Sequence, residues 1–299
     1  MKTAEWMTLF KDFLVAVRQY STHTATAYQS DVLDFARFCA REDLGELNRA
    51  SKRTAKFYMS ELNSHYPAQT VIRKVSALRA YYYFLIDQEE IKKHPFLEVT
   101  LPKRPRVTPE FLYDDDVKKM FAAIDQTTPK GMRDYTCLFM LYSSGLRVSE
   151  LVGLTLKDID VSERLIKVHG KGGKDRLVPL SKDMKALLEQ YYLIARPAFV
   201  KKKRHTKVFV NQKGDPLTPG GVRYILKEIM RVSASFLNVT PHMLRHTFAS
   251  HLIKKGADLR SVQELLGHAH LSSTQMYTHI AKDDMIDKYQ AAHPRGKKE

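Results

Sequence analysis

Six side chains in four short segments could together catalyse phosphoryl transfer. The segments are GLRVSE, HGKGGKDR, HMLRH and LLGHAHLSSTQMYTH, and the six residues are Arg147, Lys171, His242, Arg245, His268 and Tyr277. The set combines cationic groups with one phenol. A guanidinium grips phosphate oxygens with a planar fork, and such contacts favour a pentacoordinate phosphoryl transition state over its ground state. The residue types therefore predict phosphoryl transfer without a metal.

Local spacing indicates how some of these residues are positioned. His242 and Arg245 are three apart, so a helix would present both on one face. Gly145 permits the sharp turn that would start a helix with Arg147 near its N-terminus. Two extended runs flank the turn GKGG, which predicts a β-hairpin over residues 165–180 with Lys171 on its turn. Lys174 lies on the same turn and is the alternative to Lys171.

Other catalytic motifs are missing or have the wrong spacing. GKGGK lacks the Gly-x4-Gly-Lys-Ser/Thr spacing of a phosphate-binding loop, and neither Gly-x-Ser-x-Gly nor His-Glu-x-x-His occurs. His242 and His246 are four apart and could face one metal ion. However, Arg245 lies within the same turn, and its guanidinium would repel a divalent cation. We therefore expect neither a metal nor a cofactor.

The composition favours a polyanionic partner. The 299 residues include 49 Lys and Arg against 33 Asp and Glu, a formal net charge of +16, which suits nucleic acid or an acidic membrane surface. The longest apolar runs, residues 81–86 and 137–142, are far shorter than the ~20 residues that cross a bilayer. Cys39 and Cys137 show no CxxC spacing and fit a reducing compartment. We expect a cytoplasmic protein that does not insert into a membrane.

A proline-rich segment divides the chain into two domains. Helical periodicity lapses between residues 94 and 110, where four prolines block helix continuation at short intervals. We expect a helical domain over residues 1–102, a basic linker over 103–110 and a second domain over 111–299. The first domain holds 14 basic and 12 acidic residues, and the rest of the chain 35 and 21. Most of the positive charge therefore lies beyond the first domain.

The first domain is predicted to contain four or five helices and no strand. Pro67 opens a segment with an apolar stripe, and Arg73, Lys74 and Arg79 fall between the apolar positions. The pattern alone fits an ordinary core stripe with a solvated basic face. Because the second domain carries most of the positive charge, we favour a helix whose basic face lies on DNA. The second domain is mixed, with the hairpin and otherwise helices. Its predicted helices are Asp114–Ile124, Tyr135–Tyr142, Val148–Leu154, Asp183–Tyr192, Gly221–Val232, Pro241–Lys254, Leu259–Leu266 and Ser273–His279.

In this order, the four segments closely resemble those of the tyrosine recombinases, and within that family the short Xer recombinases. The segments that carry the resemblance are GLRVSEL, HGKGGKDRLVPL, PHMLRHTFASHL and LLGHAHLSSTQMYTH. The resemblance covers nearly the whole chain, with SALRAYYYFL in the first domain a looser match. It implies a mainly α fold with a small β component. A helical, SAM-like core-binding domain that contacts DNA would be joined to a mixed α+β catalytic domain.

The resemblance also implies the roles of the site residues. Tyr277 would attack a backbone phosphate, leaving a 3′-phosphotyrosine and a free 5′-hydroxyl. Arg147 and Arg245 would neutralise the non-bridging oxygens, and Lys171 would protonate the departing 5′-oxygen. His242 would take part in acid/base transfer with the phenol. No high-energy cofactor is needed, because the phosphotyrosine conserves the bond energy.

Further residues are expected to support this site or to serve the fold. His268 would support the phosphoryl oxygens. Ser149 and Glu150 are expected to hold Arg147 in place rather than to touch substrate. The remaining histidines of the second domain that we interpret as packing or capping residues are His246, His251, His270 and His279.

The implied function is site-specific DNA recombination of the Xer type, which resolves chromosome dimers. The implied partners are a double-stranded recombination site, a homo- or hetero-tetramer with a related recombinase on DNA, and a DNA translocase as activator. The tail beyond Tyr277 resembles the segment that packs into a neighbouring protomer. Three alternatives stay open: an integrase of a mobile element, a DNA-binding protein that has lost cleavage, and a type IB topoisomerase.

Overall fold

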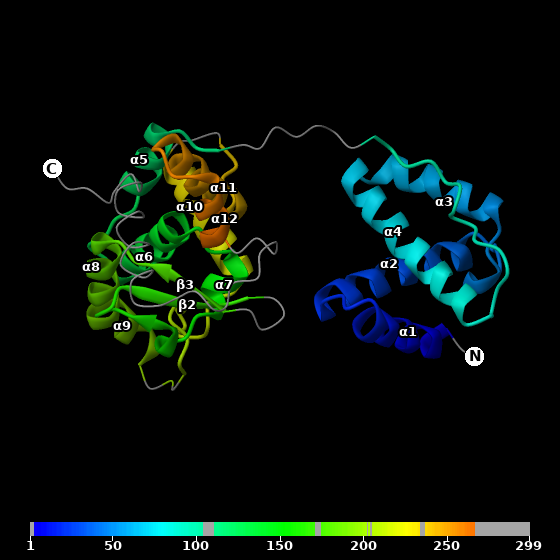
Figure 1. The fold of residues 1–299 in the computed structure, drawn as a ribbon, viewed down its shortest axis with the longest axis horizontal. Coiled ribbons are helices and arrows are strands. Elements are labelled where there is room, and N and C mark those ends of the chain that lie inside the picture. The colour runs from blue at the N-terminus through cyan, green and yellow to red at the C-terminus, as the bar shows by residue number, and fades with distance from the viewer. Residues whose placement is uncertain are drawn as a thin grey trace. The chain divides into compact units, whose positions relative to one another are not determined.

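The computed structural model divides into two compact units, residues 1–107 and 108–299 (Figure 1). We call them the helical unit and the mixed unit. The residues that the structure describes are 3–103, 111–170, 175–201, 203, 205–233 and 237–266. Within these ranges, no helix is long and apolar enough to span a bilayer. The fold is mainly α with a small β component, which confirms the class predicted from the sequence.

The described part of the helical unit contains four α-helices and no strand, as predicted. The helices are α1 (Thr3–Asp12), α2 (Thr22–Arg41), α3 (Lys52–His65) and α4 (Ala68–Asp87), with a π-helical turn at Phe13–Val17 and a 3₁₀ turn at Leu47–Arg49. Ser21 and Ser51 begin α2 and α3, and each hydroxyl accepts a hydrogen bond from the backbone N–H three residues later at 3.1 Å. Aromatic rings fill the core between the helices, among them Phe10, Phe35, Phe38, Tyr81 and Tyr82.

The basic residues of α4 do not form the free surface that their spacing predicts. Lys74 is buried, and its ammonium donates to Asp31 at 3.1 Å and to Asp34 at 2.5 Å. Arg73 forms an ion pair with Asp31. Both aspartates belong to α2, which packs against α4. The expectation of a DNA-facing basic stripe is therefore wrong for Lys74, because the neighbouring helix supplies carboxylates that the pattern of α4 alone does not reveal.

The first part of the proline-rich segment, which lies inside the helical domain expected over residues 1–102, packs on α4. The Phe96 ring is fully buried and lies edge-on to Phe35, with ring centroids 5.2 Å apart. Arg79 of α4 donates to the carbonyl oxygens of Phe96 and Val99 at 3.1 and 2.8 Å. Helix α4 already ends at Asp87, before the first proline of the segment, Pro95, and the chain around Phe96 and Val99 packs on α4. Residues 104–110 lie outside the described residues.

The mixed unit combines helices with a small antiparallel sheet (Figure 1). Its helices are α5 (Asp114–Ala122), α6 (Pro129–Ser144), α7 (Val148–Gly153), α8 (Lys182–Gln190), α9 (Arg196–Val200), α10 (Pro219–Val232), α11 (Pro241–Lys254) and α12 (Leu259–Leu266). The strands are β1 (Ile159–Asp160), β2 (Leu165–His169) and β3 (Asp175–Pro179), in the order β1-β2-β3. Lys167 lies opposite Leu177 in the β2–β3 pair, which confirms the predicted hairpin. Its turn, residues 171–174, lies outside the described residues.

Two helices differ from the prediction by more than two residues at one end. Helix α6 begins at Pro129 rather than at Tyr135, because the Thr128 hydroxyl accepts from the N–H of Gly131 at 3.1 Å and proline suits the first helical position. Helix α8 continues through a π-helical turn at Tyr191–Ala195 into α9. The helix predicted over residues 273–279 lies outside the described residues.

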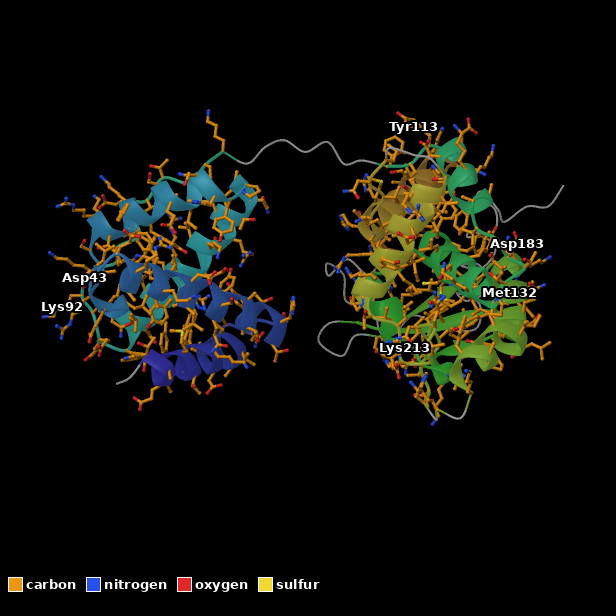
Figure 2. The ribbon with its side chains drawn as sticks, turned by 180° about the vertical axis from the view of Figure 1, so that it is seen from behind. Asp43, Lys92, Tyr113, Met132, Asp183 and Lys213 are labelled. Carbon is orange, nitrogen blue, oxygen red and sulfur yellow. The ribbon has the colours of Figure 1, made fainter. Side chains whose placement is uncertain are left out.

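Helix α6 is the central element of the mixed unit. It packs against α8 and α11, and residues 136–144 are all buried. Figure 2 draws the side chains between these elements and labels Met132 of α6 and Asp183 of α8. His251 of α11 is buried, with Nδ1 3.0 Å from the Tyr142 hydroxyl and Nε2 3.1 Å from the Leu112 carbonyl oxygen. The prediction that His251 is a packing residue is therefore confirmed.

Both cysteines are buried and free, one in each unit. Cys39 lies on α2 and Cys137 on α6. Burial raises the pKa of the Cys39 thiol to about 11 and raises the pKa of the Cys137 thiol well above its ordinary range. Both sulfur atoms therefore act as small apolar core groups.

Candidate active site

The turn between α6 and α7 places Arg147 where the sequence predicts it. Gly145 ends α6 with φ +60°, in the left-handed region, and its N–H donates to the Leu141 carbonyl at 3.1 Å. A Cβ at position 145 would lie 2.4 Å from Cδ1 of Phe248, so a larger residue would clash as well as strain the backbone. Arg147 follows as the N-cap residue of α7. The predicted role of Gly145 is confirmed.

Glu150 holds Arg147 from the first turn of α7. Its carboxylate accepts hydrogen bonds from the backbone N–H of Arg147 and from Arg147 Nη1, both at 2.8 Å. The Glu150 side chain is 8% exposed, whereas that of Arg147 is 45% exposed. The buried carboxylate of Glu150 therefore holds the Arg147 side chain in place, while part of the Arg147 guanidinium stays open to solvent. This geometry matches the positioning role expected for Glu150, while Ser149 is exposed.

Arg245 lies buried beneath the same turn. From α11 it donates through Nη1 to the Gly145 carbonyl at 2.6 Å and through Nη2 to the Leu266 carbonyl at the end of α12. The nearest Glu150 oxygen is 3.9 Å from Nη1. Burial, followed by the charge of Arg147, lowers the pKa of Arg245 to about 10. The group still carries its charge at neutral pH.

A third arginine, which we did not single out in the sequence, completes this cluster. Arg176 of β3 donates through Nη1 and Nη2 to the two oxygens of Glu150 at 3.0 and 2.8 Å, and through Nε to the Leu265 carbonyl at 3.1 Å. Its side chain is only 10% exposed. The available signal was an arginine two residues after the GKGGK turn, on a strand that continues with the apolar Leu177 and Val178. Sequence alone did not distinguish it from an ordinary solvated charge.

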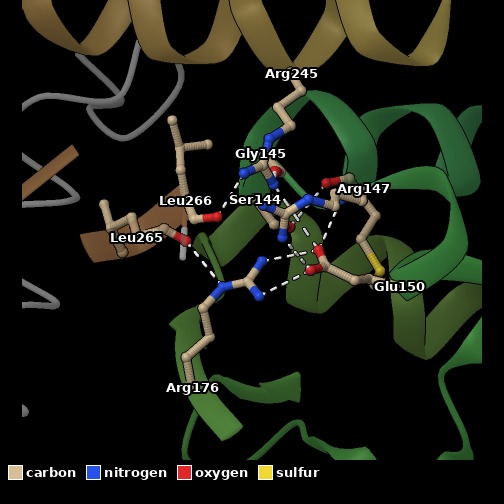
Figure 3. Close-up of polar contacts among 9 residues, drawn as sticks. Ser144, Gly145, Arg147, Glu150, Arg176, Arg245, Leu265 and Leu266 are labelled. Atoms are coloured by element: carbon tan, nitrogen blue, oxygen red, sulfur yellow. Dashed lines mark hydrogen bonds and ion pairs between the residues drawn. The ribbon is translucent and has the colours of Figure 1, made fainter. Parts of the chain in front are cut away.

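The cluster carries more positive than negative charge. Figure 3 shows the side chains of Arg147, Arg176 and Arg245 converging on Glu150. Burial by itself raises the pKa of Glu150, but hydrogen bonds from Arg176 and from Arg147 outweigh burial and lower it to about 2. One ionised carboxylate thus faces three guanidinium groups. An anion at the exposed side of Arg147 would reduce this excess of positive charge.

His242 stands one helical turn before Arg245 on α11. The Thr240 hydroxyl caps this helix by accepting from the N–H of Met243 at 3.1 Å, and Pro241 occupies the first helical position, as predicted. Helical spacing places His242 and Arg245 on one side of α11. His242 is exposed whereas Arg245 is buried. The accessible imidazole could exchange a proton with a bound substrate.

The other three predicted residues, Lys171, His268 and Tyr277, lie outside the described residues. Their flanking segments are described. The His169 ring at the end of β2 has Nδ1 2.9 Å from Asp175 and Nε2 3.1 Å from Asp158, and these two hydrogen bonds, first that with Asp175, raise its pKa. Carbonyl oxygens of the last turn of α12 accept from Arg176 and Arg245. The described residues thus bring together Arg147 and Arg245, and place His242 nearby on α11.

The described residues hold no candidate metal site. They contain no group of three or more His, Cys, Asp or Glu side chains that could hold an ion. His246, four residues after His242, is half-buried on α11. The described part of the site is therefore built from guanidinium groups, one carboxylate and an imidazole.

Comparison with known families matches both units. Residues 110–284 match the phage integrase family, and residues 7–89 match the N-terminal SAM-like domain of phage integrases. A tyrosine recombinase XerC from Bacillus pumilus is 42% identical over 291 residues, covering 96% of this chain and 95% of the relative. A second tyrosine recombinase XerC, from Bacillus licheniformis, is 40% identical, and the match covers 98% of this chain and 97% of that relative.

A solved structure supports the same fold. The XerH site-specific recombinase bound to its difH substrate superimposes with a TM-score of 0.67 at 23% sequence identity. The match covers 88% of this chain and 79% of that protein. The likeness extends the sequence relationship to the three-dimensional arrangement of the elements.

Proposed function

The chain belongs to the phage integrase family and is a site-specific tyrosine recombinase of the Xer type, and we propose here which of its residues act on DNA. From this membership we infer the residues that cut and rejoin the strands. The proposed catalytic residues are Arg147, Lys171, His242, Arg245, His268 and Tyr277. The observation that supports the assignment most directly is the excess of positive charge around Glu150. A half-exposed guanidinium held rigidly beside a buried one provides a site for one strand phosphate.

The proposed reaction is a pair of transesterifications at phosphorus. The phenolic oxygen of Tyr277 forms a bond to the phosphorus while the bond from phosphorus to the 5′-oxygen breaks, which leaves a 3′-phosphotyrosine. His242 takes part in acid/base transfer with the phenol, and Lys171 gives a proton to the departing 5′-oxygen. Attack by the 5′-hydroxyl of a second strand reverses these steps and releases Tyr277. The number of phosphodiester bonds is conserved, so the reaction requires no high-energy cofactor.

The two arginines share one task in this proposal. Arg147 and Arg245 bind the non-bridging oxygens, whose negative charge grows in the transition state, and His268 supports the same oxygens. Fixed cations favour that state without reorganising, because their positions are set before the substrate arrives. A phenol ionises near pH 10 in water, so the same charges also favour the phenolate as it attacks.

The biological setting follows from the Xer relationship. We propose that the helical unit, residues 1–102, and the mixed unit, residues 111–299, both contact a double-stranded recombination site. Four protomers, identical or paired with a related recombinase, would synapse two such sites, with a DNA translocase as activator. The task would be resolution of chromosome dimers in the cytoplasm. Deleting residues 284–299 should weaken cooperative assembly, and unchanged synapsis by the truncated chain in a gel assay would refute the role of the tail.

A nicked suicide duplex tests the chemistry. The duplex carries a site selected by binding from random sequences, and its nick lets the cleaved fragment diffuse away so that the covalent adduct accumulates. We expect wild type to form the adduct, Tyr277→Phe to form none while still binding DNA, and Tyr224→Phe to match wild type. Tyr224 is the matched control because it is an exposed tyrosine of α10.

Three outcomes would favour the alternatives. Absence of an adduct from wild type would indicate a binding protein that has lost cleavage. Relaxation of plasmids that lack the selected site would indicate a type IB topoisomerase. A selected site that matches the ends of a mobile element, rather than a chromosomal site, would indicate that element's integrase.

A further inference from the structure

We propose that Arg176 is a positioning residue that joins three parts of the active site: the β2–β3 hairpin, the Arg147 turn and the end of α12. This inference deepens the proposed function and rests on it where cleavage is concerned. Arg176 lies on β3, directly after Asp175 and opposite Val168 of β2. Its side chain reaches Glu150 of α7 and Leu265 of α12 at the same time.

The contact with Glu150 is bidentate, and both carboxylate oxygens also accept a hydrogen bond from Arg147. Each Glu150 oxygen accepts one hydrogen bond from Arg176, at 3.0 and 2.8 Å, and one from Arg147, at 2.8 Å. A planar fork fixes the plane of the carboxylate as well as its distance. The orientation of Arg147 therefore depends on Arg176 through the shared carboxylate. A lysine at position 176 could keep the charge but could not hold both oxygens in one plane.

The contact with Leu265 fixes the point from which the chain leaves α12. The last carbonyl groups of a helix lack partners within the helix, and cations are favoured at this end. Arg176 Nε donates to Leu265 at 3.1 Å, and Arg245 donates to the next carbonyl, that of Leu266. The segment that carries His268 and Tyr277 begins directly after Leu266. Arg176 thus links the end of α12, after which that segment begins, to Glu150, the carboxylate that holds Arg147.

This arrangement predicts an effect on the rate of cleavage rather than on DNA affinity. Arg176 is nearly buried and contacts groups of the protein, so its loss removes no exposed phosphate contact. A displacement of about 1 Å in a reacting group can cost roughly 10²-fold in rate. We expect Arg176→Gln to lower the single-turnover rate of adduct formation at saturating DNA by about 30–100-fold. The DNA concentration for half-saturation should change by less than about 3-fold.

Arg133 offers a matched control within the same unit. Its side chain is 4% exposed, and it too binds one carboxylate, Asp134 at 2.5 Å, and one carbonyl, that of Val210 at 2.9 Å. None of these partners belongs to the cluster around Glu150. Arg133→Gln should therefore lower stability without slowing cleavage by the folded protein. A purely structural role for Arg176 would make the two variants behave alike.

Two readouts on the full-length chain test the proposal. The first is single-turnover cleavage of the nicked duplex by wild type, Arg176→Gln, Arg176→Lys and Arg133→Gln. The second is amide hydrogen exchange of residues 259–266 without DNA, which does not depend on catalysis. We expect exchange in α12 to accelerate by at least about 10-fold in Arg176→Gln and to stay unchanged in Arg133→Gln. Arg176→Lys should restore part of both, and it replaces Arg176→Gln if that variant does not fold.

The outcomes separate this proposal from the proposed function. Wild-type cleavage by Arg176→Gln at saturating DNA, or an equal loss in Arg133→Gln, would overturn the positioning role. Unchanged exchange in α12 would overturn the anchoring of that helix. If wild type itself forms no adduct, the proposed function fails, and exchange in α12 still decides whether Arg176 anchors the helix.

Discussion

Two of the buried cations, Lys74 of the helical unit and Arg245 of the mixed unit, have different partners. In the helical unit, Lys74 contacts two carboxylates, those of Asp31 and Asp34. In the mixed unit, Arg245 contacts two neutral carbonyl groups, and the nearest carboxylate oxygen, on Glu150, is 3.9 Å away. Burial alone would lower the pKa of both. The hydrogen bonds with Asp34 and Asp31 raise the pKa of Lys74, whereas the pKa of Arg245 falls to about 10.

The difference separates a cation whose charge is neutralised within the fold from one whose charge is not, and the second pattern fits the phosphate-binding role that we propose for Arg245. The charge of Lys74 is neutralised inside its own domain, so this cation gains nothing from an external anion. Arg245 is desolvated without full neutralisation, and it lies beside the half-exposed Arg147. Incomplete neutralisation costs stability, and such costs concentrate at functional sites. A phosphate between the two arginines would recover part of that cost.

Removing Arg245 should give the largest effect, and that effect should fall on catalysis. Arg245→Met keeps the length of the side chain but loses the charge and the fork, so cleavage of the nicked duplex should slow by about 10⁴-fold. Stability should fall by only about 1–2 kcal/mol, because two carbonyl groups lose a donor but no carboxylate is left alone. Single-turnover cleavage and urea unfolding measure the two quantities. A loss of stability without a comparable loss of rate would place Arg245 with the structural cations.

Removing Lys74 should have the opposite pattern. Lys74→Met leaves the buried Asp31 carboxylate without its buried partner, which should lower the free energy of unfolding of the helical unit by about 3–5 kcal/mol. Cleavage by the folded protein should change by less than about 3-fold. Arg37→Met is the matched control, because Arg37 also pairs with Asp34 but its side chain is 73% exposed. That pair should contribute less than about 1 kcal/mol. Equal effects of the two substitutions in urea unfolding would contradict this account of the cluster.

Acid titration should isolate the contribution of Glu150. Its folded pKa of about 2 lies below the roughly 4.3 of an unfolded glutamate, so its ionisation stabilises the fold fully above that unfolded value. This stabilisation is lost as the pH falls through about 2, and it amounts to about 3 kcal/mol at most. The difference in unfolding free energy between wild type and Glu150→Gln should therefore shrink between pH 5 and pH 2. A difference that stays constant over this range would mean that the carboxylate is not held in its ionised form.

Local patterns in the sequence predicted most of the fold. Hydrophobic periodicity placed nearly every helix, and the extended runs on both sides of GKGG placed the hairpin. The start of α6 was missed although Thr128 and Pro129 carry the usual signals. The burial of Lys74 and of Phe96 could not be predicted locally, because both depend on which other helix faces them.

Those parts of the candidate site that lie within one short sequence motif could be predicted. Those parts that depend on contacts between distant segments could not. The turn at Gly145 and the support of Arg147 by Glu150 follow from residues within one segment. Arg176 lies 26 positions from Glu150, and its second partner, Leu265, contributes only a backbone oxygen. No side-chain pattern identifies a carbonyl acceptor. Contacts of this kind become visible only when the strand, the short helix and α12 are seen together.

The burial of both native sulfur atoms makes the protein suitable for labelling in its natural form. The chain has two cysteines in all, and neither thiol is accessible in the folded protein. Cysteines introduced at Lys92 and Lys213, exposed positions in different units (Figure 2), would be the sole sites to react with maleimide dyes. Fluorescence energy transfer between the two dyes could then compare the separation of the units with and without a DNA site, with every native residue of the core left in place.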